Sequence, residues 1–363
     1  MNFHKTIIVT VIFLRHSLAG AQVITGIVCD QDTKLPISDV HVYLDGTSIN
    51  TITNNSGEFE LNTKSTLNTR LVLHHLSYEA ALIERPFEGL PDTLFLKGQM
   101  NTISEVTILA DRFTREQKMK AFREQFLGAS RAGRSCTIVN EGDIQLSVNM
   151  QTRRLLASSD KPIVVINDYL GYRISFILID YWVEYGSFQS GLDNEFVRGS
   201  FFAVTSSFVD LAPDNRRIKR RRDNVFDGSS NHFFKSLAND DLKENNFMVF
   251  NKSFPVDYRN YFAMKDTLTL KMVSIIPDTD INRILTSTTN NITFADYSVP
   301  KLSGIISVLY RRRTQSDIYF STDFFFVDSF GNIDQIDKIS FGGQMGKNRA
   351  GDMLPIDYEQ SNR

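Results

Sequence analysis

Apolar and polar residues alternate through most of residues 23–110. Val40, Val42 and Leu44 fall on one side of an extended chain, and the same spacing recurs further on. Because successive side chains of a β-strand point to opposite faces, this period of two predicts strands that each bury one face. About seven short strands in such a segment predict a small β-sandwich, because each sheet must cover its apolar face with another sheet. The apolar positions that continue the pattern are Phe59, Leu61, Leu71, Leu73, Val106 and Ile108.

The first residues have the order of an export signal. Lys5 precedes an apolar run from Thr6 to Leu14, and the small residues Ala19-Gly20-Ala21 follow. This order is typical of a secretory signal peptide, and the apolar run is too short to span a bilayer. We therefore expect a signal peptide at residues 1–21, export of the chain, and no transmembrane segment in the mature protein. A formal net charge of −2 gives no general attraction to nucleic acid.

The front of the mature chain carries a family resemblance. Residues 24–61 read ITGIVCDQDTKLPISDVHVYLDGTSINTITNNSGEFEL, which resembles the carboxypeptidase-regulatory-like domain. That family is a transthyretin-like β-sandwich found behind the catalytic domain of some metallocarboxypeptidases and in front of the plug of many TonB-dependent outer-membrane receptors. The resemblance implies such a domain at residues 22–111 of a bacterial envelope protein, in the periplasm or associated with the outer membrane. The chain departs from the family at Asn54, where Asp is usual.

A connecting helix is predicted at residues 112–129. Thr114 and Gln117 have the spacing of a capping box, apolar residues three and four apart lead to Phe126, and Gly128 is a typical residue after the last turn. No plug sequence follows. The helix is expected to join the two domains.

Residues 130–363 predict a second, larger β-rich domain with a helical insertion near residues 214–243. The fold class is thus mostly β. Residues 310–320, YRRRTQSDIYF, predict a hairpin whose arginines mark a sheet edge, where charge discourages further pairing. The final stretch, GGQMGKNRAGDMLPIDY, resembles a group of bacterial envelope proteins that follow the same type of front domain, and this likeness implies no activity.

Residues for catalysis or metal binding form no known motif. His74 and His75 are neighbours in a predicted strand, so they face opposite sides and cannot hold one ion together. Cys29 and Cys136 are either small buried residues or a disulfide formed in an oxidising compartment. We predict no cofactor and no metal. The alternative is a glycan or peptide hydrolase, because two carboxylates that converge only in the fold leave no sequence motif.

The strongest local charge lies in residues 216–223, RRIKRRRD. On a helix, Arg217, Arg220 and Arg221 share one side, which either pairs with acidic neighbours or meets an anionic partner. His232 and Tyr310 complete the candidate binding residues. We expect a non-catalytic exported envelope protein that acts as a binding or assembly module, alongside an outer-membrane receptor or another envelope protein or glycan, and not with nucleic acid.

Overall fold

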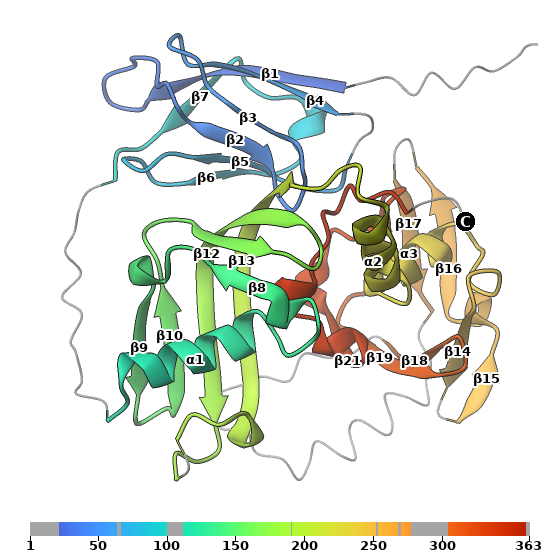
Figure 1. The fold of residues 1–363 in the computed structure, drawn as a ribbon. Coiled ribbons are helices and arrows are strands. Elements are labelled where there is room, and N and C mark those ends of the chain that lie inside the picture. The colour runs from blue at the N-terminus through green and yellow to red at the C-terminus, as the bar shows by residue number, and fades with distance from the viewer. Residues whose placement is uncertain are drawn as a thin grey trace, which may run out of the picture.

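The computed structural model describes residues 22–63, 67–99, 112–189, 191–251, 253–267, 270–276 and 304–360. Within these ranges the chain is mostly β, as predicted, and its buried apolar side chains gather into three cores (Figure 1). The expected signal peptide at residues 1–21 lies outside the described residues. So does the expected strand with Val106 and Ile108.

The first body is a sandwich of two sheets. One sheet has the order β4-β1-β7 and the other β3-β2-β5-β6. Val40, Val42, Leu44, Leu71 and Leu73 are fully buried between them, so the alternation identified this core correctly. The strands are β1 (Gln22–Asp30), β2 (His41–Leu44), β3 (Asn50–Ile52), β4 (Glu58–Thr63), β5 (Leu71–His74), β6 (Ala81–Ile83) and β7 (Thr93–Leu96).

The second body is a six-stranded sheet covered by α1 (Arg115–Phe126). The predicted capping box is confirmed: Thr114 Oγ1 accepts from the Gln117 N–H and Gln117 Oε1 accepts from the Thr114 N–H. Phe126 is fully buried against the sheet. The strands are β8 (Cys136–Ile138), β9 (Gln145–Asn149), β10 (Arg154–Ser158), β11 (Ile163–Asn167), β12 (Tyr172–Tyr185) and β13 (Val197–Asp210), the last two forming one long hairpin.

The third body holds α3 (Ser230–Ala238), the second of the two helices that form near the predicted residues 214–243. The first, α2 (Arg216–Phe226), bonds to the second body through Arg221 and Arg222. The sheets of the third body have the orders β15-β14-β18-β19-β21 and β16-β17-β20. The strands are β14 (Phe247–Asn251), β15 (Phe254–Val256), β16 (Phe262–Asp266), β17 (Lys271–Ile275), β18 (Gly304–Tyr310), β19 (Thr314–Phe320), β20 (Phe324–Val327) and β21 (Ile339–Gly343). Short 3₁₀ helices occupy Pro86–Glu88, Gly133–Ser135, Glu141–Asp143, Asn194–Phe196, Tyr258–Asn260, Ile336–Lys338, Met345–Lys347 and Ala350–Asp352.

The hairpin expected at residues 310–320 is confirmed as β18 and β19, but its expected place at a sheet edge is wrong. Both strands are inner strands of the five-stranded sheet. Arg311 and Arg312 lie instead in the tight turn between them, where both have positive φ. The arginines therefore lie at the tip of the hairpin, and they do not prevent β18 from pairing with β14 or β19 from pairing with β21.

The turn after β2 joins the first body to the second. The Gly46 N–H donates to Ser206 O at 2.7 Å and the Phe208 N–H donates to Thr47 O at 2.9 Å, so the turn pairs with the outer side of β13. Gly46 has φ +77, and a Cβ there would approach the Ile356 side chain at 3.1 Å. Glycine is favoured at this position because it adopts the left-handed region freely and leaves room for the neighbouring chain.

The C-terminal segment ties the bodies together. The Ile356 N–H donates to Gly46 O at 2.8 Å, and its carbonyl accepts from Asn332 Nδ2 at 3.0 Å. Asp357 accepts two hydrogen bonds from Ser48, one from the backbone N–H and one from the hydroxyl. This segment thus contacts the first body and the third within two residues.

Candidate binding site around helix α2

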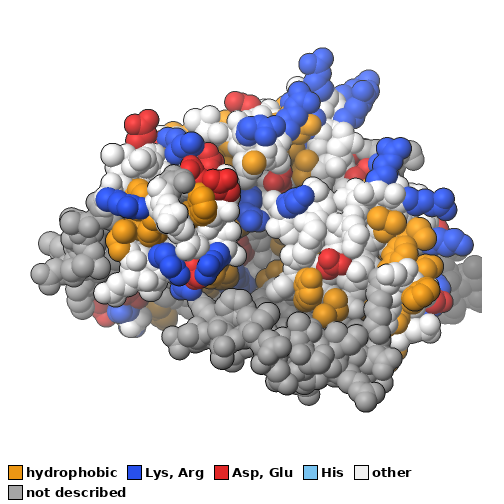
Figure 2. All heavy atoms as spheres, turned by 90° about the horizontal axis from the view of Figure 1, so that it is seen from below, with side chains coloured by type: hydrophobic (Ala, Val, Ile, Leu, Met, Phe, Trp, Pro, Cys, Tyr) orange, Lys and Arg blue, Asp and Glu red, His pale blue; other side chains and the backbone are white. Residues whose placement is uncertain are grey.

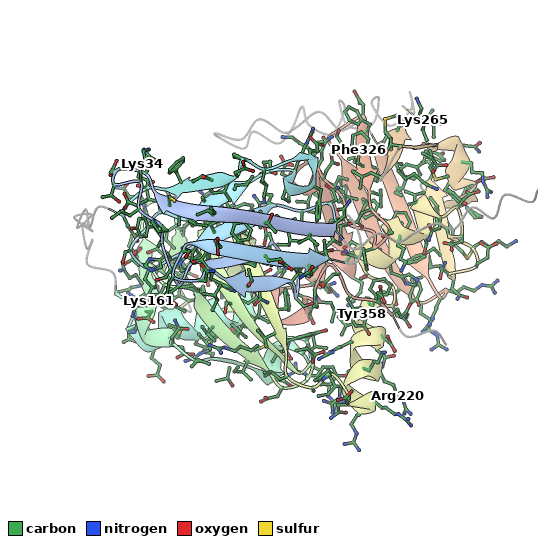
Figure 3. The ribbon with its side chains drawn as sticks, turned by 90° about the horizontal axis from the view of Figure 1, so that it is seen from above. Lys34, Lys161, Arg220, Lys265, Phe326 and Tyr358 are labelled. Atoms are coloured by element: carbon green, nitrogen blue, oxygen red, sulfur yellow. The ribbon has the colours of Figure 1, made fainter. Side chains whose placement is uncertain are left out.

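Helix α2 begins at a strong N-cap. Asn215 Oδ1 accepts from the Arg217 N–H at 3.0 Å and from the Ile218 N–H at 3.2 Å, which satisfies two amides of the first turn. Figure 3 shows the helix reaching out from the body, with Arg220 directed away from it and Tyr358 nearer the body. Asn215 thus starts the helix at the point where the chain leaves the sheet.

The outer face of α2 is basic. Arg216, Arg217, Lys219 and Arg220 are exposed, and the first turn contains no acidic residue. The amino end of a helix carries a partial positive charge, so these cations add to it rather than cancel it. Lys and Arg side chains project along this margin of the molecule in Figure 2. The result is a local concentration of positive charge in a chain of almost balanced net charge.

Arg221 differs from the other two arginines predicted for this face. It is half-buried, its Nη1 donates to Tyr169 O at 3.2 Å, and its guanidinium lies 4.6 Å from the centre of the Tyr169 ring. Arg131 lies over the same ring at 5.1 Å. The structure therefore places Arg217 and Arg220 outward and folds Arg221 back onto the second body.

Arg222, which is not among the candidate binding residues of the sequence analysis, is the most deeply buried cation of the run. Its side chain is 6% exposed, and it forms an ion pair with Asp210 through both carboxylate oxygens at 2.6 and 2.7 Å. It also donates to Leu170 O and Gly171 O. Burial opposes ionisation of both groups, but their mutual hydrogen bonds and charge attraction, with the Ala212 N–H bonded to Asp210, together outweigh it, so the pKa of Asp210 is lowered and the pKa of Arg222 is raised.

His232 and Tyr310 are buried and do not share the exposed face of α2. His232 Nδ1 accepts from the Gly228 N–H at 3.0 Å, and its ring packs against Phe247 and Tyr310. Burial lowers the pKa of His232, which favours the neutral imidazole. The contacts of both residues are those of a packed aromatic core.

A pocket of about 220 Å³ lies beside Arg222, where the first body, the β12–β13 hairpin, α2 and the C-terminal segment meet. The ion pair of Arg222 and Asp210 forms part of its wall. Tyr358 closes another side, and its hydroxyl donates to Asp223 at 2.7 Å. The pocket is lined by Ser48, Tyr172, Asp210, Pro213, Lys219, Arg222, Pro355, Asp357, Tyr358 and Glu359.

The cysteines and the remaining histidines, which could act as nucleophiles or metal ligands, make structural contacts instead. Cys29 and Cys136 are free thiols, which decides between the two alternatives left by the sequence. Burial raises the pKa of Cys136 to about 12, so its thiol stays protonated. His41 and His74 face each other across β2 and β5, and burial lowers the pKa of both. Over the described ranges no three His, Cys, Asp or Glu side chains are grouped to hold a metal.

Comparison with known proteins agrees with the architecture of the first body. Residues 24–108 match the family model of the CarboxypepD_reg-like domain. This segment is a carboxypeptidase-regulatory-like domain. In the regulatory-like domain, Asn54 Oδ1 accepts from the backbone N–H groups of Ser56 and Glu58, so it makes the same turn contacts that an Asp carboxylate would make.

No curated protein and no solved structure matches the chain. None of the helices in the described ranges is both long and apolar enough to cross a bilayer. The regulatory-like domain contributes Ser48 to the pocket, so this domain takes part in the candidate site as well as in the fold.

Proposed function

We propose that this protein is a non-catalytic, exported envelope protein that acts as a binding and assembly module, with the outer face of α2 as its contact surface. The observation that carries the proposal is the exposed positive charge of Arg216, Arg217, Lys219 and Arg220 on a projecting helix. Partners that meet such a face carry anionic groups. The regulatory-like domain supports this role by holding the two downstream bodies in a fixed arrangement.

The described residues form no ion pair with the four exposed cations of α2, and contact with an anionic partner would account for charges left in this state. Cations at the amino end of a helix each cost about 0.3–1 kcal/mol against the helix dipole at low salt. Acidic residues in the first turn would instead stabilise the helix, so stability alone does not account for the basic residues there. An anionic partner offsets the cost by binding both the side chains and the helix end.

The test uses the purified mature chain as bait against a native envelope fraction. The wild-type protein should recover an anionic partner at about 0.1 M salt and lose it at about 1 M, where the screening length falls to about 3 Å. A double variant, Arg217→Ala with Arg220→Ala, should lose most of the recovery. Its charge-matched control is Lys243→Ala with Lys265→Ala. Both residues are exposed and outside α2, and Lys265 lies on the opposite side of the molecule from Arg220 in Figure 3. Equal recovery by the two double variants would refute the proposal.

Export has its own measurement. Mass spectrometry of the protein isolated from the envelope should find Gln22 at the amino terminus, because the small residues before it fit signal-peptidase cleavage. A mature chain that retains residues 1–21 would contradict export by cleavage.

The hydrolase alternative draws on the carboxylates that line the pocket, Asp210, Asp357 and Glu359. A glycosidase needs one carboxylic acid whose pKa is raised so that it can protonate the leaving group. Arg222 instead holds Asp210 ionised, and Asp357 is engaged by Ser48. Turnover of chromogenic glycosides or peptides that is abolished by Asp357→Asn would favour the alternative.

A further inference from the structure

The pocket beside Arg222 is a candidate ligand site that shares Lys219 with the basic outer face of α2. Lys219 and Arg222 line it from the helix, Ser48 from the regulatory-like domain, and Glu359 from the C-terminal segment. Its volume of about 220 Å³ lies below the range of about 300–1,000 Å³ that is usual for drug-sized ligands. A ligand with a single ring fits this size.

The deep wall of the pocket is polar but carries no net charge. Arg222 and Asp210 neutralise each other, and the guanidinium is held by two further carbonyl acceptors. Four of the five N–H groups of Arg222 are engaged by described residues, which leaves one on Nη1. The carboxylate of Asp210 keeps spare lone pairs. The wall therefore offers both a donor and an acceptor, each fixed in place by the ion pair.

The rim has free charges of both signs. Lys219 and Glu359 are exposed and line the pocket, and the described residues provide neither side chain with a hydrogen-bond or ion-pair partner. Pro213 and Pro355 contribute apolar surface to the lining. The small space thus combines donors, acceptors and apolar surface.

We propose that this pocket binds one ring of a neutral saccharide. A hydroxyl group both donates and accepts, so a pyranose can satisfy the ammonium of Lys219, the carboxylate of Glu359 and the fixed Arg222–Asp210 pair at once. An anionic ligand would be repelled by the three carboxylates of the lining. A cationic ligand would be repelled by Lys219 and Arg222, and Asp210 in the deep wall is already neutralised by Arg222. The C–H faces of a pyranose match the two proline rings. The inference does not depend on the proposed contact surface of α2.

The experiment is isothermal titration of the full mature chain with D-glucose, D-galactose, D-mannose and N-acetyl-D-glucosamine. Inorganic phosphate and L-lysine are the anionic and cationic comparison probes. At least one saccharide should bind, with a dissociation constant in the range of roughly 1 mM that is common for few-contact ligands. Neither charged probe should compete with it.

Variants of the rim locate the binding. Lys219→Met and Glu359→Gln should each weaken the saccharide about ten-fold, which is the loss of one hydrogen bond to a charged group. The matched controls Lys265→Met and Glu244→Gln change exposed residues outside the lining and should leave the affinity unchanged. The proposal fails if none of the four saccharides binds, if binding is indifferent to both rim variants, or if phosphate or lysine occupies the site instead. Loss of partner recovery by the Arg217 and Arg220 variants leaves this result unaffected, so the two proposals can fail separately.

Discussion

Replacing Arg222 with methionine should destabilise the second body far more than any other single change in the basic run. Methionine keeps an unbranched apolar stem but loses the cation–π contact of the guanidinium, which lies 3.9 Å from the centre of the Tyr172 ring. The variant also loses the four hydrogen bonds to Leu170 O, Gly171 O and the two oxygens of Asp210. The effect therefore reports the contacts of the guanidinium group.

The loss of unfolding free energy can be estimated from the hydrogen bonds that each acceptor retains in the variant. Gly171 O still accepts from the Leu211 N–H, whereas Leu170 O loses its side-chain donor, and an orphaned buried acceptor costs about 1–3 kcal/mol. Breaking a fully buried ion pair costs about 3–5 kcal/mol. The Asp210 side chain is 31% exposed, so water solvates its carboxylate after the ion pair is broken. The cost of breaking this pair is therefore smaller than for a fully buried one. The free energy of unfolding should fall by about 2–4 kcal/mol in total.

Trp182 provides the assay because it is the only tryptophan of the chain and lies in β12 of the same sheet. Urea unfolding followed by its fluorescence should show the midpoint of Arg222→Met well below that of the wild type. Arg220→Met removes an equal charge from the exposed face and should change the free energy by about 0.5 kcal/mol or less. If the two variants unfold within error of each other, the buried ion pair is not a main support of this body and the reasoning is wrong.

Four further predictions concern other parts of the structure. Thr114→Ala should cost about 1 kcal/mol of unfolding free energy through loss of the capping box, with Thr114→Ser retaining most of it. Gly331→Ala should cost about 3 kcal/mol or more in a thermal melt, because φ is +90 and the new Cβ would lie 2.1 Å from a backbone oxygen; Gly142→Ala, with open space around it, should be nearly neutral. Cys136 should resist iodoacetamide at pH 8 in the folded protein and react after unfolding, since burial raises its pKa to about 12; rapid labelling of the native thiol would contradict this. NMR titration should find the pKa of His232 below its ordinary value near 6.5, so the free energy of unfolding should decrease as pH falls from 6.5 toward the lowered pKa, because the unfolded chain binds the proton first; a midpoint at or above 6.5 would count against burial as the cause.

The sequence predicted well wherever one periodic rule decides the structure. Alternation placed Val40, Val42 and Leu44 in the core of the regulatory-like domain, because a strand at the surface of a sandwich has only one way to bury such residues. The spacing of Thr114 and Gln117 likewise located the start of α1, since a capping box depends on neighbours only three residues apart. Both results depend on local chain geometry alone.

The candidate site could not be assembled in this way. The partner of Arg222 is Asp210, at the end of β13, and the pocket adds Ser48 and Asp357, which are separated by most of the chain. Helical spacing gives the side of α2 on which a residue lies but does not tell which side meets the body. Arg222 was therefore not among the residues predicted for the site, although a buried arginine requires a carboxylate partner. The sequence offers Asp210 and Asp214 just before the basic run, and spacing alone does not tell which of them pairs with Arg222.

The regulatory-like domain has a role that its sandwich core alone does not explain. Its turn after β2 pairs with β13 through Gly46 and Thr47, and the next residue, Ser48, holds Asp357 at the rim of the pocket. Asp45, beside the same turn, is half-buried and accepts from the Ser206 N–H at 2.8 Å. Displacement of this turn would remove hydrogen bonds from β13 and the contacts of Ser48 with Asp357, while Asn332 and Asp223 would still hold the C-terminal segment. The domain therefore contributes one wall residue, Ser48, to the pocket and positions Asp357 at its rim.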